Sequence, residues 1–185
     1  RNRLIAVNRI SAVADSSGYL FAALHNLRVD RSTTTRELNA EQGAAPSSML
    51  QQVRDADMKA LKASVAALEA TDFPERQQSL TRLAQAVSKL EALHKESVTA
   101  IGQPKAQRRS NLAQEYNKET ADLMELIDKI SSQLNRAVKL EDSLTDQLLV
   151  MKQLAWMARN AAGDASVMIS NAMAGLPLPP CGCPM

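Results

Sequence analysis

The feature that most restricts the fold of this chain is a stretch from Lys105 to Ala162 that contains no glycine and no proline. Apolar residues recur along it at steps of three and four, which is the spacing of one face of an α-helix. One uninterrupted helix over residues 105–174 would be about 100 Å long at 1.5 Å per residue. Asp142 or Ser143 provides an N-cap within this stretch, so we predict that two helices meet there.

Three short breaks divide the rest of the chain, which shows the same apolar periodicity. The breaks lie at Gly43–Ser47, Asp72–Pro74 and Gly102–Pro104. Each contains a proline, which cannot continue a helix, and Ser47 and Asp72 are the predicted N-caps. Because the connections are short, consecutive helices should run antiparallel. The predicted helices cover residues 2–41, 47–71, 74–101, 105–140 and 143–174, before an irregular tail at 175–185.

The composition agrees with helices that share an aliphatic core. Hydrophobic residues make up 45% of the chain, whereas aromatic residues make up only 3%. A sheet protein would need more turn residues and runs of β-branched or aromatic side chains. We therefore predict an all-α, antiparallel bundle of four or five long helices that forms a single domain over residues 1–185.

The pattern of charged residues gives no sign of nucleic-acid binding, and the pattern of apolar residues gives no sign of a membrane span. The 22 basic and 20 acidic residues are interspersed, so no basic block indicates nucleic-acid binding. No stretch approaches the ~18 uninterrupted apolar residues of a membrane span. The chain begins with Arg1, so we expect any signal or anchoring segment of the parent protein to lie outside it.

Residues that support catalysis or metal binding are scarce. The chain has no glycine-rich phosphate loop and no nucleophile elbow. His25 and His94 lie on separate predicted helices. Glu91 and His94 form the one E-x-x-H spacing in the chain, whereas a di-metal bundle needs such pairs on several helices, so we interpret both histidines as structural. Cys181 and Cys183 supply two sulfurs, whereas a tetrahedral site needs four ligands. We predict no catalytic residue, no metal and no cofactor, and we expect that the chain is not an enzyme.

One helix face carries a group of hydrogen-bond donors suited to a small anion. Arg28, Arg31 and Thr35 are spaced i, i+3 and i+7, with Ser32 alongside them. Guanidinium groups bind carboxylates and oxoanions through paired hydrogen bonds, and hydroxyls add further donors. The alternative is a solvated helix face whose arginines pair with nearby acids.

A second candidate group lies within "LAWMARNAAG", residues 154–163. Trp156, Arg159 and Gly163 fall on one helix face, where they could line a ligand pocket. The alternative is that Trp156 fills space in the bundle core while Arg159 extends to solvent.

Two segments resemble a known class of receptor domain. "ALHNLRVDRSTT" (23–34) resembles the first-helix signature of extracytoplasmic helical-bundle sensor domains of the nitrate- and nitrite-sensing type. "LEDSLTDQLLVMKQLAWMARNAAG" (140–163) resembles a later helix of the same receptors. The resemblance implies that Arg28 and Arg31 face the ligand, with Trp156 and Arg159 as partners from the later helix. Ser32 stands where the nitrate-sensing pattern usually has glycine, which points away from nitrate itself.

The resemblance implies a periplasmic, extracytoplasmic sensor domain of a bacterial chemoreceptor or sensor histidine kinase. Such a domain is a homodimer, is joined to the membrane by flanking spans outside this chain, and signals by helix displacement when a small carboxylate or oxoanion binds. The main alternative is a structural or adaptor bundle that binds other proteins, which predicts an exposed apolar stripe and solvent-facing Arg28 and Arg31. A lipid-binding bundle is disfavoured by the few aromatics and the even charge mixing.

Overall fold

The computed structural model describes residues 2–139 and 143–175, and all regular structure within these ranges is helical. This confirms the prediction of an all-α fold. The helices are α1 (Asn2–Asn39), α2 (Ser48–Glu69), α3 (Arg76–Ile101), the short 3₁₀ turn η1 (Lys105–Gln107), α4 (Leu112–Lys139) and α5 (Ser143–Met173).

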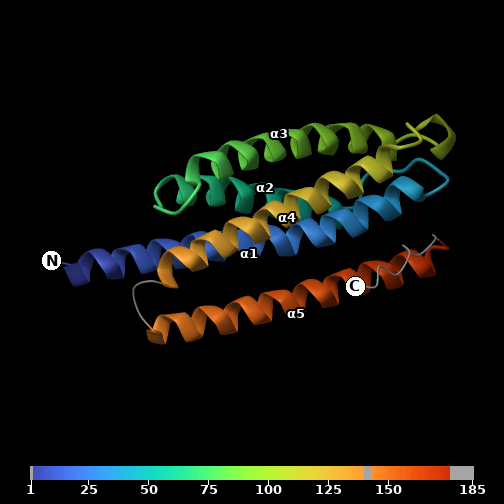
Figure 1. Ribbon diagram of the computed structural model, residues 1–185. Helices are drawn as coiled ribbons and strands as arrows, with labels where there is room; N and C mark the ends of the chain where they lie inside the picture. Colours follow the sequence, from blue (N-terminus) through green and yellow to red (C-terminus); the bar gives the residue numbers. More distant parts are fainter. Residues whose placement is uncertain (1, 140–142, 176–185) are drawn as a thin grey trace.

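The helices alternate in direction along the chain (Figure 1). Helices α1 to α4 form a four-helix bundle in which α1 packs on α2 and α4, and α3 completes the ring between them. Helix α5 lies along one side of this bundle, next to α1 and α4 and parallel to α1 (Figure 1). The four-helix part is the up-down-up-down arrangement that short connections produce.

The bundle core is aliphatic, as the composition indicates. Leucines on the apolar stripes of α1 to α4 are buried, and burial of each contributes about 1.5–3 kcal/mol. They include Leu20, Leu27, Leu50, Leu61, Leu83, Leu90, Leu123 and Leu134. Among the described side chains of α5, only Trp156 is buried in this core. We conclude that α5 is the least firmly packed of the long helices.

The first turn of α2 begins as predicted, whereas α3 begins later. The Ser47 side chain accepts a hydrogen bond from the backbone N–H of Leu50 at 3.2 Å, so Ser47 is the N-cap. The prediction that Asp72 caps the next helix is wrong, because α3 starts at Arg76 after Glu75 in the left-handed region with φ 61°. The physical reason is that Phe73 turns inward and is buried, which adds a turn before the helix.

The fourth helix also begins later than predicted, at Leu112 instead of Lys105. Arg108 has an extended backbone, and its guanidinium donates hydrogen bonds to the backbone carbonyls of Glu37, Leu38, Ala40 and Gln42. Arg108 thus satisfies carbonyls at the end of α1 that have no partner within the helix. The spacing of apolar residues gives no indication of this contact between distant segments, so it could not be predicted from that spacing.

The break between the last two helices is confirmed, since α4 ends at Lys139 and α5 begins at Ser143. The proposed cap Asp142 and both cysteines, Cys181 and Cys183, lie outside the described residues. Within the described ranges, no helix combines the length and the apolar character that a membrane crossing requires.

Candidate functional site

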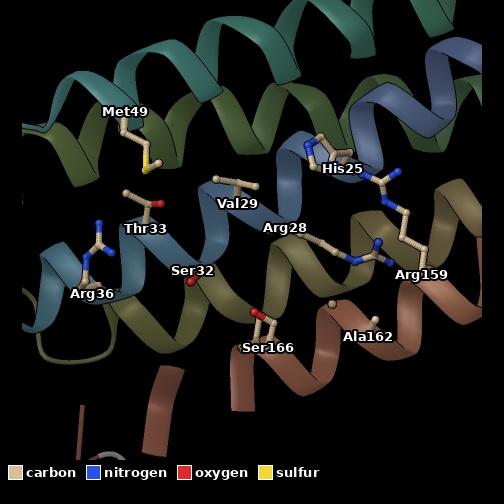
Figure 2. Close-up of a pocket in the computed structure, with 12 residues that line it drawn as sticks. His25, Arg28, Val29, Ser32, Thr33, Arg36, Met49, Arg159, Ala162 and Ser166 are labelled. Atoms are coloured by element: carbon tan, nitrogen blue, oxygen red, sulfur yellow. Dashed lines mark hydrogen bonds between the residues drawn. The ribbon is translucent and has the colours of Figure 1, made fainter. Parts of the chain in front are cut away.

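A groove of about 450 Å³ lies between α1 and α5 (Figure 2). This volume is within the range of small-molecule sites. The groove is lined by three arginines, one histidine and three hydroxyl side chains, and by no carboxylate. These polar residues are Arg28, Arg36, Arg159, His25, Ser32, Thr33 and Ser166. The lining therefore offers hydrogen-bond donors and positive charge, which is the chemistry that recognises an anion.

Arg28 joins α1 to α5. Its guanidinium donates a hydrogen bond to the Asn160 side chain, and its Nε is buried without a hydrogen-bond partner. The side chain lies directly over Gly163, where an added Cβ would be 2.7 Å from Arg28 Cδ. Gly163 is therefore the residue that allows Arg28 to lie against α5.

Arg159 extends from α5 toward α1 (Figure 2). Its Nη2 is 2.8 Å from His25 Nδ1, and its guanidinium lies 4.8 Å from the centre of the Phe21 ring. The Phe21 ring also forms an edge-to-face pair with Trp156, with the two ring centres 5.4 Å apart. Trp156 is only 2% exposed and does not line the groove.

The positive charges of the groove act on one another. Burial lowers the pKa of His25, and the charges of Arg159 and Arg28 lower it further. A neutral His25 can accept the hydrogen bond from Arg159 at Nδ1. Burial also lowers the pKa of Arg28; Asp164 opposes this, and Arg31 and Arg159 add to it. An anion in the groove would relieve this repulsion.

The structure brings together some of the candidate residues and separates others. Arg28, Ser32 and Arg159 line the same groove, and Thr35 lines an adjoining hollow of about 520 Å³ that shares Ser32 with it. Arg31 instead lies 3.6 Å from Asp164 as an ion pair between α1 and α5, with its side chain 13% exposed. Trp156 is buried in the core and does not line the groove, so the alternative interpretation of this residue holds.

Sequence reasoning missed Arg36, His25 and Ser166. Arg36 follows Arg28 and Ser32 at steps of four, and this spacing also places residues on one helix face. Helical spacing alone also groups Thr35 with Arg28, but the Thr35 hydroxyl donates a hydrogen bond to Asn117 on α4 at 3.0 Å.

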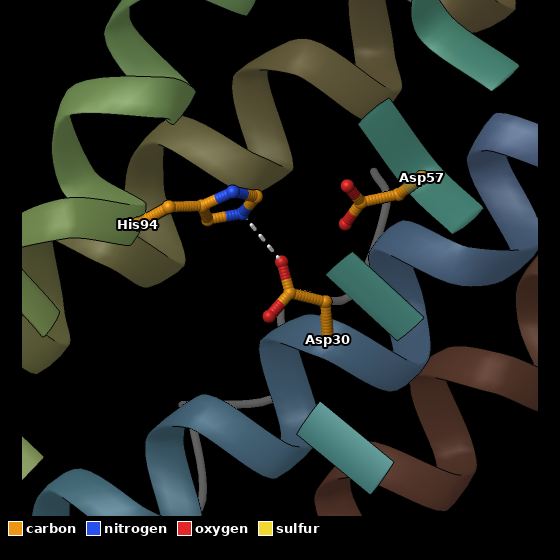
Figure 3. Close-up of side chains that lie close together, drawn as sticks. All are labelled: Asp30, Asp57 and His94. Carbon is orange, nitrogen blue, oxygen red and sulfur yellow. Dashed lines mark hydrogen bonds and ion pairs between the residues drawn. The ribbon is translucent and has the colours of Figure 1, made fainter. Parts of the chain in front are cut away.

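A second polar group lies inside the four-helix bundle (Figure 3). Asp30 is fully buried and accepts four hydrogen bonds, at 2.8 Å from Thr34, 3.2 Å from Arg54, 2.9 Å from His94 and 2.5 Å from Tyr116. Burial raises the pKa of Asp30, but the hydrogen bond from His94 and the charge of Arg54 outweigh it and lower the pKa to about 2. Asp30 is thus a buried carboxylate that is ionised and fully hydrogen-bonded.

Arg54 is the matching buried cation. Besides its bond to Asp30, its guanidinium donates to Thr34 at 2.9 Å, to Ser97 at 2.7 Å and to the backbone carbonyl of His94 at 3.2 Å. A buried ion pair is tolerated when further hydrogen bonds satisfy its remaining groups, as they do here.

Asp57 on α2 is a further ionisable side chain of this buried group. It is fully buried, and neither of its carboxyl oxygens has a hydrogen-bond partner. Burial and the negative charge of Asp30 raise its pKa to about 9. The sequence contains a signal for this residue, because Asp57 interrupts the apolar stripe of α2 between Val53 and Leu61. Such a position is normally aliphatic.

No family model matches the chain, and it shows no significant similarity to any curated protein sequence or solved structure. The resemblance to nitrate- and nitrite-sensing receptors therefore stays a prediction that rests on the two sequence segments.

Proposed function

We propose that this chain is a ligand-sensing helical bundle that binds a small anion in the groove between α1 and α5. The observation that carries the proposal is the composition of the groove, which presents Arg28, Arg36 and Arg159 and no carboxylate. Asp164, the acid that acts on Arg28, pairs with Arg31 and does not line the groove, so three arginines around this hollow favour a negatively charged ligand.

The hydrogen-bond pattern supports the same proposal. Among the described residues, none of the ion pairs involves Arg28, Arg36 or Arg159. Arg28 Nε also lacks a partner although it is buried. A carboxylate or oxoanion would accept hydrogen bonds from these groups, and hydrogen bonds between charged groups are worth roughly twice those between neutral ones.

The position of the groove suggests how binding produces a signal. An anion held by Arg28 and Arg36 on α1 and by Arg159 on α5 would link two helices that are otherwise held by few buried contacts. Trp156 is the only described α5 side chain buried in the core, so α5 is held to α1 largely by polar contacts, which a ligand in the groove would add to. A ligand that prefers one relative position shifts the population toward it. Long helices transmit such axial shifts over their whole length.

The cellular role follows from the resemblance and is part of the proposal. The domain would be the periplasmic sensor part of a bacterial chemoreceptor or sensor histidine kinase, acting as a homodimer with membrane spans outside this chain. It is supported by the fact that Arg28 and Arg159, from the two resembling segments, line one groove. Arg28 and Arg31 are both largely shielded from solvent, unlike the arginines of a solvated face.

A second candidate function is a scaffold that binds another protein, and one observation favours it. Helix α5 exposes several large apolar side chains, at exposed fractions of 66% for Met151 and 61% for Ile169. Leu154, Met157 and Met173 belong to the same exposed set. Exposed apolar side chains gathered on one helix can mark an interaction site.

A thermal-shift screen tests the anion site. The wild type is heated with small carboxylates, aromatic acids and inorganic oxoanions, each paired with its neutral amide or ester at matched ionic strength. Binding to the native state adds about 2.7 kcal/mol of stability at a ligand concentration one hundred times Kd. We expect an acid to raise the Tm where its neutral analogue does not.

Matched arginine variants locate the effect. The shift should be lost in Arg36→Ala and Arg159→Ala and kept in Arg82→Ala, which removes an exposed arginine from α3 on the far side of the bundle. A shift of equal size in all three variants would show that the anion binds elsewhere. If no anion shifts the wild type, the scaffold function is favoured.

A further inference from the structure

Three potential metal ligands meet in the core of the four-helix bundle, and none of them lines the anion groove. Asp30 comes from α1, Asp57 from α2 and His94 from α3, and one ligand atom from each lies within 4.8 Å of the other two. Figure 3 shows the two carboxyl groups and the imidazole ring converging on one point. Both aspartates are fully buried, and His94 is nearly so.

The feature of this cluster that points to a ligand is the side chain of Asp57, which is buried without a hydrogen-bond partner. Asp30 already accepts hydrogen bonds from Thr34, Arg54, His94 and Tyr116. These four partners take up most of the hydrogen-bonding capacity of Asp30, whose charge raises the pKa of the neighbouring Asp57. Both Asp57 oxygens are buried without a partner, and a polar group in that state costs stability. The side chain nevertheless points into the cluster, as a ligand would.

We propose that Asp30, Asp57 and His94 bind one divalent transition-metal cation of the Zn²⁺ type. Imidazole nitrogen and carboxylate oxygen together suit borderline cations such as Zn²⁺ or Co²⁺. Calcium prefers six to eight oxygen ligands and is disfavoured by the histidine. Bundle cores commonly build such sites from side chains on facing helices.

The surrounding residues fit this assignment. His94 Nε2 and Asp30 Oδ2 are 2.9 Å apart, close to the separation of two neighbouring ligand atoms on a cation with bonds of about 2.0–2.2 Å. On binding, His94 would release its hydrogen bond to Asp30 and turn its lone pair to the cation. Arg54 and Tyr116 would remain hydrogen-bonded to Asp30 and hold it in place, as partners of metal ligands commonly do.

The charges of Asp30, Arg54 and Asp57 favour the binding of one cation. Arg54 neutralises Asp30 through their ion pair at 3.2 Å. Asp57 has no cation of its own, so its negative charge is the one that a bound divalent ion would meet. A proton on Asp57 and a metal ion are thus alternative occupants of the same position.

The test is a metal-loading experiment on the full chain. Because the site is enclosed, the protein is unfolded with a chelator and refolded with Zn²⁺ or Co²⁺, and loosely bound metal is removed by gel filtration. We expect one Zn²⁺ per chain by elemental analysis. The Co²⁺ form should show visible absorption bands that report nitrogen and oxygen ligands.

Two variants and one control decide the result. Asp57→Asn and His94→Gln should each lose at least nine-tenths of the bound metal while keeping the helical circular dichroism of the wild type. Asp55→Asn changes an exposed acid two residues away and should keep full occupancy. The proposal is overturned if the wild type retains no metal, or if Asp57→Asn and His94→Gln both bind as much as the wild type.

Discussion

Replacing Asp57 with asparagine should stabilise the metal-free bundle at neutral pH. Asp57 has a pKa of about 9 in the folded chain, against an ordinary value of 3.8. The folded protein therefore keeps a proton at neutral pH that the unfolded chain has lost. A group with a raised folded pKa costs nothing below the unfolded pKa, and its cost grows as the pH rises toward the folded pKa.

The size of the effect follows from the same values. Each pH unit above 3.8 costs about 1.4 kcal/mol, so at pH 7 the cost is about 4 kcal/mol if the surroundings do not relax. Asparagine has a similar shape but carries no charge to lose. It leaves a buried polar group without partners, as the protonated acid does, so that cost cancels. We expect Asp57→Asn to gain about 2–4 kcal/mol at pH 7 and close to nothing at pH 4.

Urea denaturation in chelator, followed by circular dichroism at pH 4, 5.5, 7 and 8.5, measures this difference. The gain should grow with pH up to pH 8.5. Asp55→Asn, an exposed neighbour on α2, should stay within about 0.5 kcal/mol of the wild type at each pH. A difference that does not change with pH, or a loss of stability at pH 7, would refute the assignment of Asp57 as a buried, protonated acid.

Three further changes have defined outcomes. Arg54→Met leaves the fully buried Asp30 without its cation and should cost about 3–5 kcal/mol in urea denaturation; an unchanged midpoint would contradict the ion pair. Gly163→Ala places a Cβ 2.7 Å from Arg28 Cδ, which displaces the Arg28 side chain. This variant should lose the anion-induced Tm shift and keep wild-type helicity. A retained shift would argue against Arg28 as a ligand. Trp156→Ala should cost about 3–5 kcal/mol and make α5 the first site of limited proteolysis, whereas cleavage elsewhere would contradict its role in holding α5.

Much of the fold follows from the spacing of apolar residues and from the capping chemistry of single positions. The stripes on α1 to α4 are the buried faces, and Ser47 caps α2 as its hydroxyl indicates. The late starts of α3 and α4 could not be predicted, because they depend on tertiary contacts. Phe73 finds its place only against the assembled core, and Arg108 caps the end of a helix that is distant in sequence.

The candidate site was predictable in part for the same reason. Helical spacing indicated a polar face that includes Arg28, but spacing alone does not say which neighbouring helix each side chain meets. The rotation of α1 turns Thr35 toward Asn117 on α4 and Arg36 toward the groove. The buried acid Asp57 interrupts an apolar stripe, which is visible in the sequence, but only the packed bundle shows that both of its carboxyl oxygens are buried without a hydrogen-bond partner.

The central claim is that the groove between α1 and α5 binds an anion through its arginines. Isothermal titration tests it most directly, with the acid that gives the largest thermal shift and with the wild type, Arg36→Gln, Arg159→Gln and Arg82→Gln compared at the same salt concentration. Loss of one hydrogen bond to a charged group costs about 1.5–3 kcal/mol, which raises Kd by about tenfold to a hundredfold. The account predicts one ligand per chain, that increase in Kd for both groove variants, and no change for Arg82→Gln. The same Kd in all four proteins, or no saturable binding to the wild type, would contradict it.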